Sequence, residues 1–263
     1  MSEEAIKKIL ITGANGFIGG SLMRYYQNHG QDVVGVDLIG NGDNIVEGDI
    51  SQPETISQQL QECDVIIHTA ALVSNAMQDS DMWRVNVLAT RNLIQAAKEH
   101  KVRRFVQISS IVAYGNSAEG ELDETHPVHA DGGSYVLTKL ASEHVVLSEQ
   151  ANDDIEVVII RPGDAYGPGS RPWIIAPLEA IAKNQFMLPE KGEGFFRPIY
   201  IDDLVRGIAM ASRHPDADGE IFNLSCEGYM FTKDYFTPHY QWLGKKGPLA
   251  VSTKLALRIS AMA

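Results

Sequence analysis

Residues 8–19 read KILITGANGFIG. The apolar, partly β-branched run before Gly13 indicates a buried strand, and the glycines at positions 13, 16 and 19 indicate a tight turn into a helix. A helical pattern begins at Phe17 and continues to about His29, where Gly30 ends it. The segment therefore predicts a strand, a glycine turn and a helix, which is how many parallel α/β folds begin.

The remaining sequence continues this alternation. Further strands are expected at residues 32–37, 44–49, 64–68, 104–108 and 155–160, and helices at 53–62, 80–100, 134–150 and 203–213. Strands that alternate with helices predict an α/β fold with a doubly wound parallel sheet, the Rossmann type. After Arg161 the alternation stops and prolines and glycines become frequent. We expect one nucleotide-binding domain, residues 1–161 with 198–224 returning to it, and a smaller, interleaved C-terminal substrate-binding region, residues 162–197 and 225–263.

Composition narrows the class of protein. The net charge of −12 disfavours a non-specific nucleic-acid binder, because such proteins neutralise phosphates with a basic surface. No run of about 18 apolar residues occurs, so no membrane span is expected. The two cysteines, Cys63 and Cys226, are too few for a disulfide framework and suit the reducing cytoplasm. The histidines His126 and His129 have no supporting ligand cluster, so we expect no metal site.

The glycine turn and Asp37 together point to a dinucleotide. Glycines let the pyrophosphate approach the amide groups at a helix N-terminus, and Asp37 ends the next strand about 20 residues later. A carboxylate there binds the 2′-hydroxyl of the adenosine ribose and repels a 2′-phosphate, which favours NAD over NADP as the cofactor. The alternative is an ordinary turn with a solvated Asp37.

A tyrosine, a lysine and a pair of serines are candidate catalytic groups. Tyr135 and Lys139 lie one helical turn apart, hence on one face, and a lysine ammonium near a phenol lowers the pKa of the phenol. Ser109 and Ser110 end the strand 104–108, where a hydroxyl can bind a substrate carbonyl. Either serine could instead cap a helix or turn.

In their order and spacing, several segments resemble the extended short-chain dehydrogenase/reductase family, also called NAD-dependent epimerases/dehydratases. They are TGANGFIG at 12–19, Asp49-Ile50, His68–Ala71, Asn86-Val87, SSIVAYG at 109–115, YVLTK at 135–139 and Arg161-Pro162. The resemblance implies that Ser110 is the catalytic serine, Tyr135 the general acid/base and Lys139 its partner. It also implies a set of NAD-binding residues, namely Gly13, Gly16, Phe17, Ile18, Gly19, Asp37, Asp49, Ile50, Thr69, Ala70, Ala71, Asn86, Tyr135, Lys139, Pro162 and Gly163. Many relatives dimerise through the helices at 80–100 and 134–150, so the resemblance implies a homodimer.

The chemistry within this family is narrowed by two segments. Dehydratases carry an acidic residue beside the catalytic hydroxyl, and SSIVAYG has none. Nucleotide-sugar epimerases usually place an arginine where GEGFFRPIYIDD, residues 192–203, has Phe196 when aligned without gaps; a one-residue shift would bring Arg197 there instead. Phe195 and Phe196 suggest an apolar substrate wall, similar to the hydroxysteroid-dehydrogenase and dihydroflavonol-reductase-like branch, or else ordinary core packing.

We therefore expect an NAD-dependent oxidoreductase that interconverts a secondary alcohol and a ketone, with a small molecule as its substrate. The first alternative is a nucleotide-sugar 4-epimerase with tightly bound NAD. The second is a non-catalytic NAD-sensing or scaffold protein, against which the set of Ser110, Tyr135 and Lys139 argues.

Overall fold

The structure is a computed structural model that describes residues 6–41, 44–61, 63–73, 78–115, 120–151 and 154–260. The chain forms two compact units, the first comprising Met1–Pro162 and Asp202–Leu224 and the second Gly163–Ile201 and Ser225–Ala263. The chain thus leaves the first unit after β6, returns to it with α7 and leaves it again after β10.

The first unit is built on a seven-stranded sheet in which every neighbouring pair of strands is parallel. The order across the sheet is β10-β6-β5-β4-β1-β2-β3. The strands are β1 (Lys8–Thr12), β2 (Asp32–Asp37), β3 (Ile45–Glu47), β4 (Val65–His68), β5 (Arg104–Ile108), β6 (Glu156–Pro162) and β10 (Ile221–Leu224). The doubly wound parallel sheet predicted from the sequence is confirmed.

The order of the strands fixes where a ligand can bind. From β1 the sheet grows in one direction through β2, and from β4 it grows in the other through β5. The carboxyl ends of β1 and β4 therefore flank the point where the strand order reverses, which is where open α/β sheets bind their ligands.

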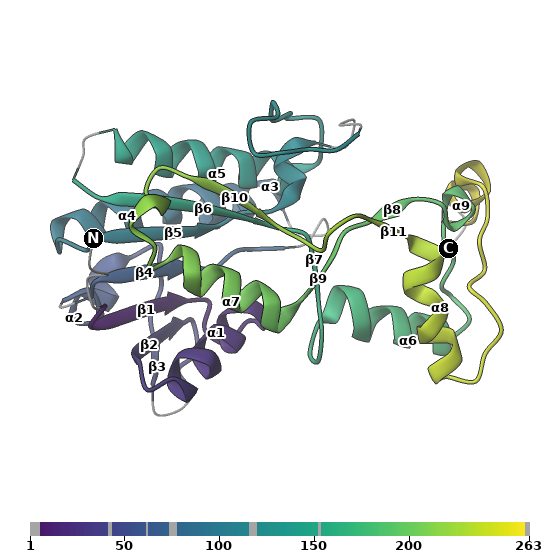
Figure 1. The fold of residues 1–263 in the computed structure, drawn as a ribbon, viewed down its shortest axis with the longest axis horizontal. Helices are drawn as coiled ribbons and strands as arrows, with labels where there is room; N and C mark the ends of the chain where they lie inside the picture. The colour runs from purple at the N-terminus through teal and green to yellow at the C-terminus, as the bar shows by residue number, and fades with distance from the viewer. Residues whose placement is uncertain are drawn as a thin grey trace. The chain divides into compact units, whose positions relative to one another are not determined.

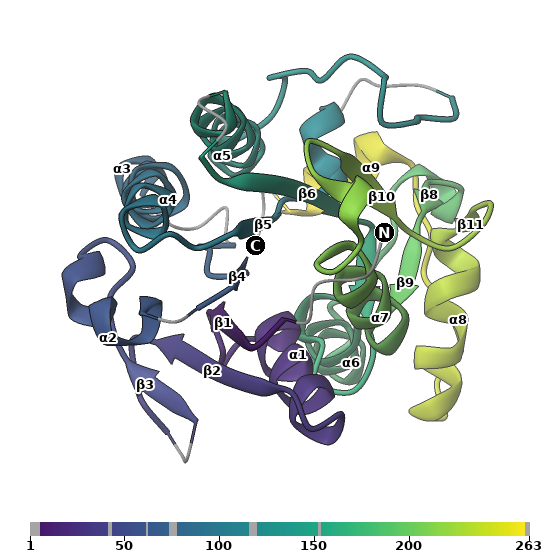
Figure 2. The same ribbon diagram turned by 60° about the vertical axis from the view of Figure 1, so that its left-hand side comes forward.

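Helices cover both faces of this sheet. They are α1 (Phe17–Asn28), α2 (Ser57–Leu60), α3 (Asp79–Trp83), α4 (Thr90–Glu99), α5 (Ser134–Gln150) and α7 (Ile201–Ala211), with the short turns η1 (Pro53–Ile56), η3 (Ile111–Tyr114) and η6 (Pro215–Ala217). In Figures 1 and 2, α1 and α7 lie on one face and α4 and α5 on the other. Tyr26 on α1 and Ser212 just after α7 share a hydrogen bond of 3.1 Å between their hydroxyls, which agrees with this arrangement.

The helix predicted at 80–100 differs from the structure in one respect. Its middle, η2 (Arg84–Ala89), is a π-helical segment between α3 and α4. Apolar periodicity does not reveal such a change of pitch, and π-turns inside α-helices are often found at functional sites. This one carries Asn86, a predicted site residue.

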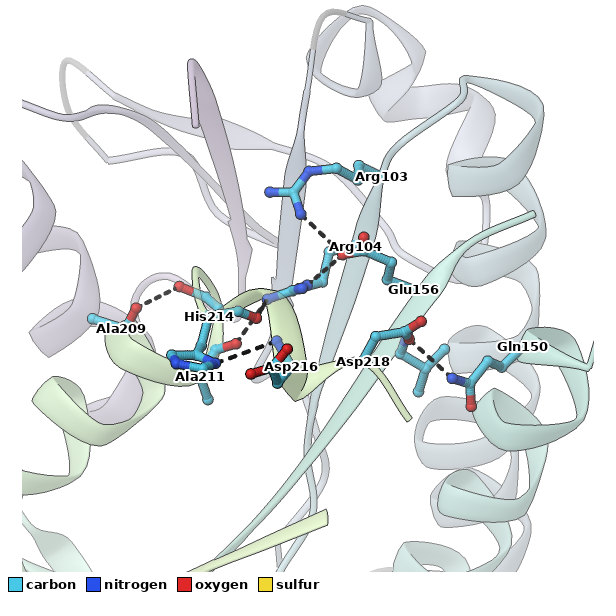
Figure 3. A network of polar contacts seen from close by, with 11 residues as sticks. Arg103, Arg104, Gln150, Glu156, Ala209, Ala211, His214, Asp216 and Asp218 are labelled. Carbon is cyan, nitrogen blue, oxygen red and sulfur yellow. Dashed lines mark hydrogen bonds and ion pairs between the residues drawn. The ribbon is translucent and has the colours of Figure 1, made fainter. Parts of the chain in front are cut away.

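Arg104 holds the returning helix α7 onto the sheet at the amino end of β5 (Figure 3). The Arg104 side chain is 0% exposed, and its Nη1 donates to the carbonyl oxygens of Ala211 at 3.0 Å and His214 at 2.8 Å. Its Nε donates to Glu156 on β6 at 2.6 Å. The last carbonyls of a helix have no hydrogen-bond partners within the helix. Because the buried Arg104 guanidinium donates to such carbonyls, it stabilises the end of α7.

The second unit has its own aromatic core. Its elements are β7 (Asp164–Tyr166), η4 (Arg171–Ile175), α6 (Ala176–Ala182), η5 (Glu190–Gly192), β8 (Phe195–Phe196), β9 (Pro198–Tyr200), β11 (Met230–Phe231), α8 (Thr232–Trp242) and α9 (Thr253–Ser260). β7 pairs with β9 in parallel, and β8 pairs with β11 in antiparallel register. The core is formed by Leu188, Phe196, Tyr235 and Phe236, against which further aromatic side chains pack.

Candidate active site

The glycine turn after β1 is tightly packed. Gly13 adopts φ +70°, and a Cβ there would lie 2.8 Å from the backbone of Ala70. A Cβ on Gly19 would lie 2.1 Å from the carbonyl oxygen of Gly13. Gly16 is the N-cap of α1 and contributes no side-chain cap. No side-chain hydrogen bond caps the N-terminus of α1, where Phe17 and Ile18 lie. Its backbone N–H groups are therefore available to bind a pyrophosphate.

Asp37 lies beside this turn. Its Oδ2 accepts a hydrogen bond from the backbone N–H of Asn15 at 2.9 Å, and its Oδ1 accepts one from Leu38 N–H at 2.8 Å. The carboxylate at the end of β2 is therefore fixed against the glycine turn. A carboxylate held there can accept hydrogen bonds from the hydroxyls of a ribose whose pyrophosphate lies at α1.

The segment after β4 forms the opposite side of the turn. Thr69 Oγ1 donates to Thr12 O at 2.7 Å, and Ala70 packs against the main core of the first unit. Leu72, which follows Ala71, is held by Asn86: the Asn86 side chain accepts from Leu72 N–H at 2.7 Å and donates to Leu72 O at 3.0 Å. Asn86 is buried and fixes the backbone of this segment at Leu72.

The two residues predicted near the adenine differ in exposure. Asp49 is partly exposed, and its Oδ1 accepts from Ser51 N–H at 2.8 Å. Ile50 is buried in the main core of the first unit. Asp49 is therefore the more accessible of the two to a ligand.

Four consecutive residues from the end of β5 onward each contact α5. Gln107 Nε2 donates to Ser142 Oγ at 3.4 Å, Ile108 O accepts from Lys139 Nζ at 2.8 Å, and Ser109 Oγ donates to Glu143 Oε1 at 2.5 Å. Ser110 lies close enough to Tyr135 for its hydroxyl to lower the pKa of the phenol. The structure thus brings Ser110, Tyr135 and Lys139 together, and it gives the two adjacent serines different partners.

Ser110 also has the role that a strand-end serine commonly has. Its Oγ accepts a hydrogen bond from Val112 N–H at 3.3 Å and so caps η3. A hydroxyl oxygen accepts while its proton is free to be donated, so capping η3 and contacting Tyr135 are compatible.

The pKa of Tyr135 beside Lys139 differs from the expectation drawn from the sequence. Burial raises the pKa of Tyr135, and the Ser110 hydroxyl is the influence that lowers it. Burial also lowers the pKa of Lys139 to about 8, while the charge of Glu143 raises it. The expected lowering of the Tyr135 pKa by the Lys139 ammonium is absent here, because burial dominates at the phenol.

His68 lies at the end of β4, between the glycine turn and α4. Its Nδ1 is 2.7 Å from Thr12 Oγ1 and its Nε2 is 2.9 Å from Thr90 Oγ1. Burial, and then the charge of Lys139, lower the pKa of His68 to about 3. His68 is therefore a neutral bridge between hydroxyls, which agrees with the interpretation of this residue as a packed strand-end histidine.

The boundary between the two units falls at the end of β6, between Pro162 and Gly163. Pro162 ends β6, and Gly163 begins the second unit, where a Cβ would lie 2.4 Å from the carbonyl oxygen of Arg197. The Arg197 side chain is partly exposed and donates to Gly228 O at 3.1 Å, and its guanidinium lies 5.2 Å from the Tyr229 ring centroid.

The two phenylalanines before Arg197 have different surroundings. Phe196 is 2% exposed and packs against Tyr235 and Trp173, so for this residue core packing applies. Phe195 is 66% exposed and lies beside Tyr229. Because only Phe195 is exposed, it could contribute to an apolar substrate wall, whereas Phe196 could not.

The sequence model of the NAD dependent epimerase/dehydratase family matches residues 9–225. The chain belongs to the NAD-dependent epimerase/dehydratase family. It is an NAD-dependent enzyme of the extended short-chain dehydrogenase/reductase type, as the sequence motifs implied.

Three members of this family illustrate its range. The chain is 30% identical over 237 residues to the low-salt glycan biosynthesis protein Agl12 of Haloferax volcanii, covering 82% of this chain and 76% of the relative. It is 27% identical to the decarboxylating sterol-4-alpha-carboxylate 3-dehydrogenase of Candida albicans, covering 91% and 73%. It is 26% identical, with a TM-score of 0.82, to the UDP-glucuronic acid 4-epimerase from Bacillus cereus in complex with NAD, covering 93% and 87%.

The family establishes NAD as the cofactor, and the residues of the chain fit it. Glycine occupies positions 13 and 19, where a Cβ would collide with the turn, and the Asp37 carboxylate lies beside that turn. Small-molecule substrates also fit the family. In the part of the chain that the structure describes, no helix is long and apolar enough to span a bilayer.

The sequence did not reveal two buried charged residues, Glu143 and Arg161, that lie beside the predicted catalytic residues. Glu143 accepts from Arg161 Nε at 3.0 Å and from Arg161 Nη2 at 2.8 Å, and both side chains are buried. A signal for Glu143 was present, since it follows Lys139 by four residues and so shares its helix face. Arg161 on β6 is brought to it only by the packing of α5 on the sheet.

Proposed function

We propose that the chain interconverts a secondary alcohol and a ketone, with Ser110, Tyr135 and Lys139 as its catalytic residues. The observation that carries the proposal is the proximity of the Ser110 hydroxyl to Tyr135, with Lys139 on the same helix face as Tyr135. A hydroxyl beside a phenol can bind one substrate oxygen from two sides. Bound NAD supplies the hydride acceptor or donor for such a reaction.

The proton is moved by Tyr135. Burial raises the pKa of its phenol, so the phenol is protonated at neutral pH and suited to donate to a carbonyl oxygen during reduction. Ser110 donates to the same oxygen and stabilises the charge that develops on it. In the reverse direction, Tyr135 as a phenolate would accept the proton of the alcohol.

The cofactor is held by the residues of the glycine turn and of its neighbours. We propose Gly13, Gly16, Phe17, Ile18 and Gly19 for the pyrophosphate, and Asp37 for the adenosine ribose. Asp49 and Ile50 flank the adenine, whereas Thr69, Ala70, Ala71 and, through Leu72, Asn86 line the segment after β4. Tyr135, Lys139, Pro162 and Gly163 lie toward the nicotinamide. The second unit, as the substrate-binding region, selects the substrate.

The choice of substrate class depends on Phe196. In an alignment without gaps it occupies the position where nucleotide-sugar epimerases of the family usually carry an arginine, and it is buried among aromatic rings. A buried phenylalanine cannot form the charge-assisted contact by which an arginine holds a diphosphate. This favours an uncharged, moderately apolar alcohol or ketone.

A second candidate, a nucleotide-sugar 4-epimerase, is favoured by the likeness to an epimerase that binds UDP-glucuronic acid and NAD. Arg197, one residue after Phe196, is partly exposed and lies over Tyr229. In that case Arg197 would replace the missing arginine.

The proposal is tested with purified protein, NAD or NADH, and panels of ketones, sterol-like alcohols and nucleotide sugars. Net formation or consumption of NADH supports the oxidoreductase, and C4 inversion without net NADH supports the epimerase. Tyr135→Phe is expected to lower turnover at least about 100-fold while NAD still binds. Tyr25→Phe, on α1, serves as the control. Near wild-type turnover of Tyr135→Phe would contradict the assignment.

We also propose a cytoplasmic homodimer. Cys63 and Cys226 are free thiols, which suits a reducing compartment. Leu88, in η2, is 54% exposed, and Trp83 at the end of α3 is also exposed. A second copy packed on this helical face would bury them. Sedimentation equilibrium tests this: the wild type is expected to be a dimer and Leu88→Asp a monomer, and a monomeric wild type would contradict it.

A further inference from the structure

The buried carboxylate of Glu143 lies on the helix face that carries the proposed catalytic pair. Tyr135, Lys139 and Glu143 follow one another at intervals of four residues on α5, so their side chains lie along one face. Glu143 is 1% exposed and Lys139 is 5% exposed. Carboxylates are rarely buried to this extent unless other groups compensate their charge.

Two groups compensate the charge of Glu143. Arg161 on β6 donates to both of its oxygens, at 3.0 Å and 2.8 Å, in the fork geometry typical of a strong guanidinium–carboxylate pair. Ser109 donates to Oε1 at 2.5 Å. Arg161 also lies over the Tyr114 ring, 4.8 Å from its centroid. Glu143 is therefore fixed in place by one group on β6 and one at the end of β5.

The charge of Glu143 favours the protonated form of Lys139. Its burial lowers the pKa of its ammonium to about 8, and the charge of Glu143 opposes this. The neutral contact of Nζ, the Ile108 carbonyl at 2.8 Å, satisfies one donor of the ammonium. Without the Glu143 charge, a buried ammonium would release its proton nearer to neutral pH.

Among the described residues, the other titratable groups around Lys139 do not supply that charge. His68 on β4 is neutral at neutral pH because its pKa is about 3. Arg161 on β6 is positive and is paired with Glu143. Tyr135 on α5 is held protonated by burial. Asp79, whose Oδ1 accepts from Ser134 at the start of α5, is exposed.

We propose that Glu143 is a positioning residue that keeps Lys139 in its charged form. Arg161 and Ser109 hold the carboxylate in place, on the residue one helical turn after Lys139. The proposal deepens the proposed function, since it rests on Lys139 being part of the catalytic site. It assigns a purpose to a buried ion pair that would otherwise contribute little stability over apolar packing.

The test measures the pKa of Lys139 itself, in protein labelled with ¹³C at the lysine Cε, by NMR over a pH series. The resonance is assigned by its loss in Lys139→Met. Glu143→Gln combined with Arg161→Met removes both charges of the ion pair together, so neither Glu143 nor Arg161 is left buried without its partner. The expected result is a fall of the Lys139 pKa by at least about one unit in this double variant.

Two further variants separate charge from packing. Ser109→Ala removes a contact of Glu143 but keeps its charge, and it is expected to leave the Lys139 titration near that of the wild type. Glu143→Asp keeps the charge but retracts it by one methylene, so a smaller fall is expected; this variant carries the test should the double variant not fold. An unchanged Lys139 titration in a folded double variant, or in Glu143→Asp when the double variant does not fold, overturns the proposal.

The titration needs no substrate, so its outcome is independent of the proposed function. If Lys139 shifts as expected while Tyr135→Phe retains full turnover, the role of Glu143 stands and the catalytic assignment fails. If turnover depends on Tyr135, the alkaline limb of the rate profile should move to lower pH in the double variant by the same interval as the NMR titration. A purely structural role of Glu143 would lower stability without moving that limb.

Discussion

The hydroxyl of Ser110 lies beside the phenol of Tyr135 and lowers its pKa. Its neighbour Ser109 instead donates to Glu143, on the same helix two turns further along. Both serines follow Ile108, the last residue of β5, and Ser110 is extended (φ −164°, ψ 154°), so the two side chains point in different directions. The two hydroxyls are therefore available for separate tasks on one helix.

The two serines should respond differently to removal of their hydroxyls. Ser110→Ala is expected to lower turnover about 100-fold, because a donor to the reacting oxygen is lost. Ser109→Ala should lower turnover by less than about tenfold and should instead cost about 1–3 kcal/mol of stability, since buried Glu143 loses a hydrogen bond. Parallel measurements of NADH-linked turnover and of urea unfolding check both values. Equal losses of turnover would contradict the separation of roles.

Asp37 should govern the preference for NAD over NADP. Asp37→Asn keeps an oxygen that can accept from Asn15 N–H and removes the charge that repels a 2′-phosphate. We expect the ratio of NADH to NADPH affinities to fall by about 10- to 100-fold, the equivalent of one charge-assisted contact. Fluorescence titration with both cofactors gives this ratio, with Asp32→Asn at the start of the same strand as the control. An unchanged ratio would show that another group makes the choice.

His68 should make the protein less stable at mildly acidic pH. Its pKa is about 3 in the folded chain, against an ordinary value near 6.5 when unfolded. Below pH 6.5 the unfolded state takes up a proton that the folded state does not, so stability falls with pH. The expected loss is about 2 kcal/mol between pH 7 and pH 5. His68→Gln should remove this part of the loss in unfolding experiments at the two pH values; an identical pH dependence in wild type and variant would contradict it.

Arg104 should contribute to stability through α7 (Figure 3). Arg104→Met leaves the carbonyls of Ala211 and His214 without their buried donor, and we expect a loss of about 2–4 kcal/mol. Arg103, which also pairs with Glu156 but is more exposed, is the matched control, and Arg103→Met should cost less than about 1 kcal/mol. Thermal unfolding of both variants provides the comparison. A similar, small loss for the two variants would show that α7 is held by its apolar contacts alone.

Much of the fold could be predicted because the signals are local. β1, β2, β5 and α5 lie where the apolar runs and periodicity predicted them, and Gly13 and Gly19 stand where backbone crowding demands glycine. The π-helical segment around Asn86 was not predictable, since its apolar pattern is that of an ordinary helix. The pKa direction of Tyr135 was predicted wrongly, because burial outweighs the neighbouring charge and depends on contacts that the sequence does not show.

By itself, the sequence determined the dinucleotide-binding turn, the family and the residue types of Ser110, Tyr135 and Lys139, because each depends on short spacings along one strand or helix. Only the tertiary structure decided which serine meets Tyr135, that Phe196 is buried, and that Arg161 compensates Glu143. These contacts join residues that are distant in the chain. They arise from the packing of α5 on β5 and β6 and from the aromatic core of the second unit, and no local pattern encodes such pairings.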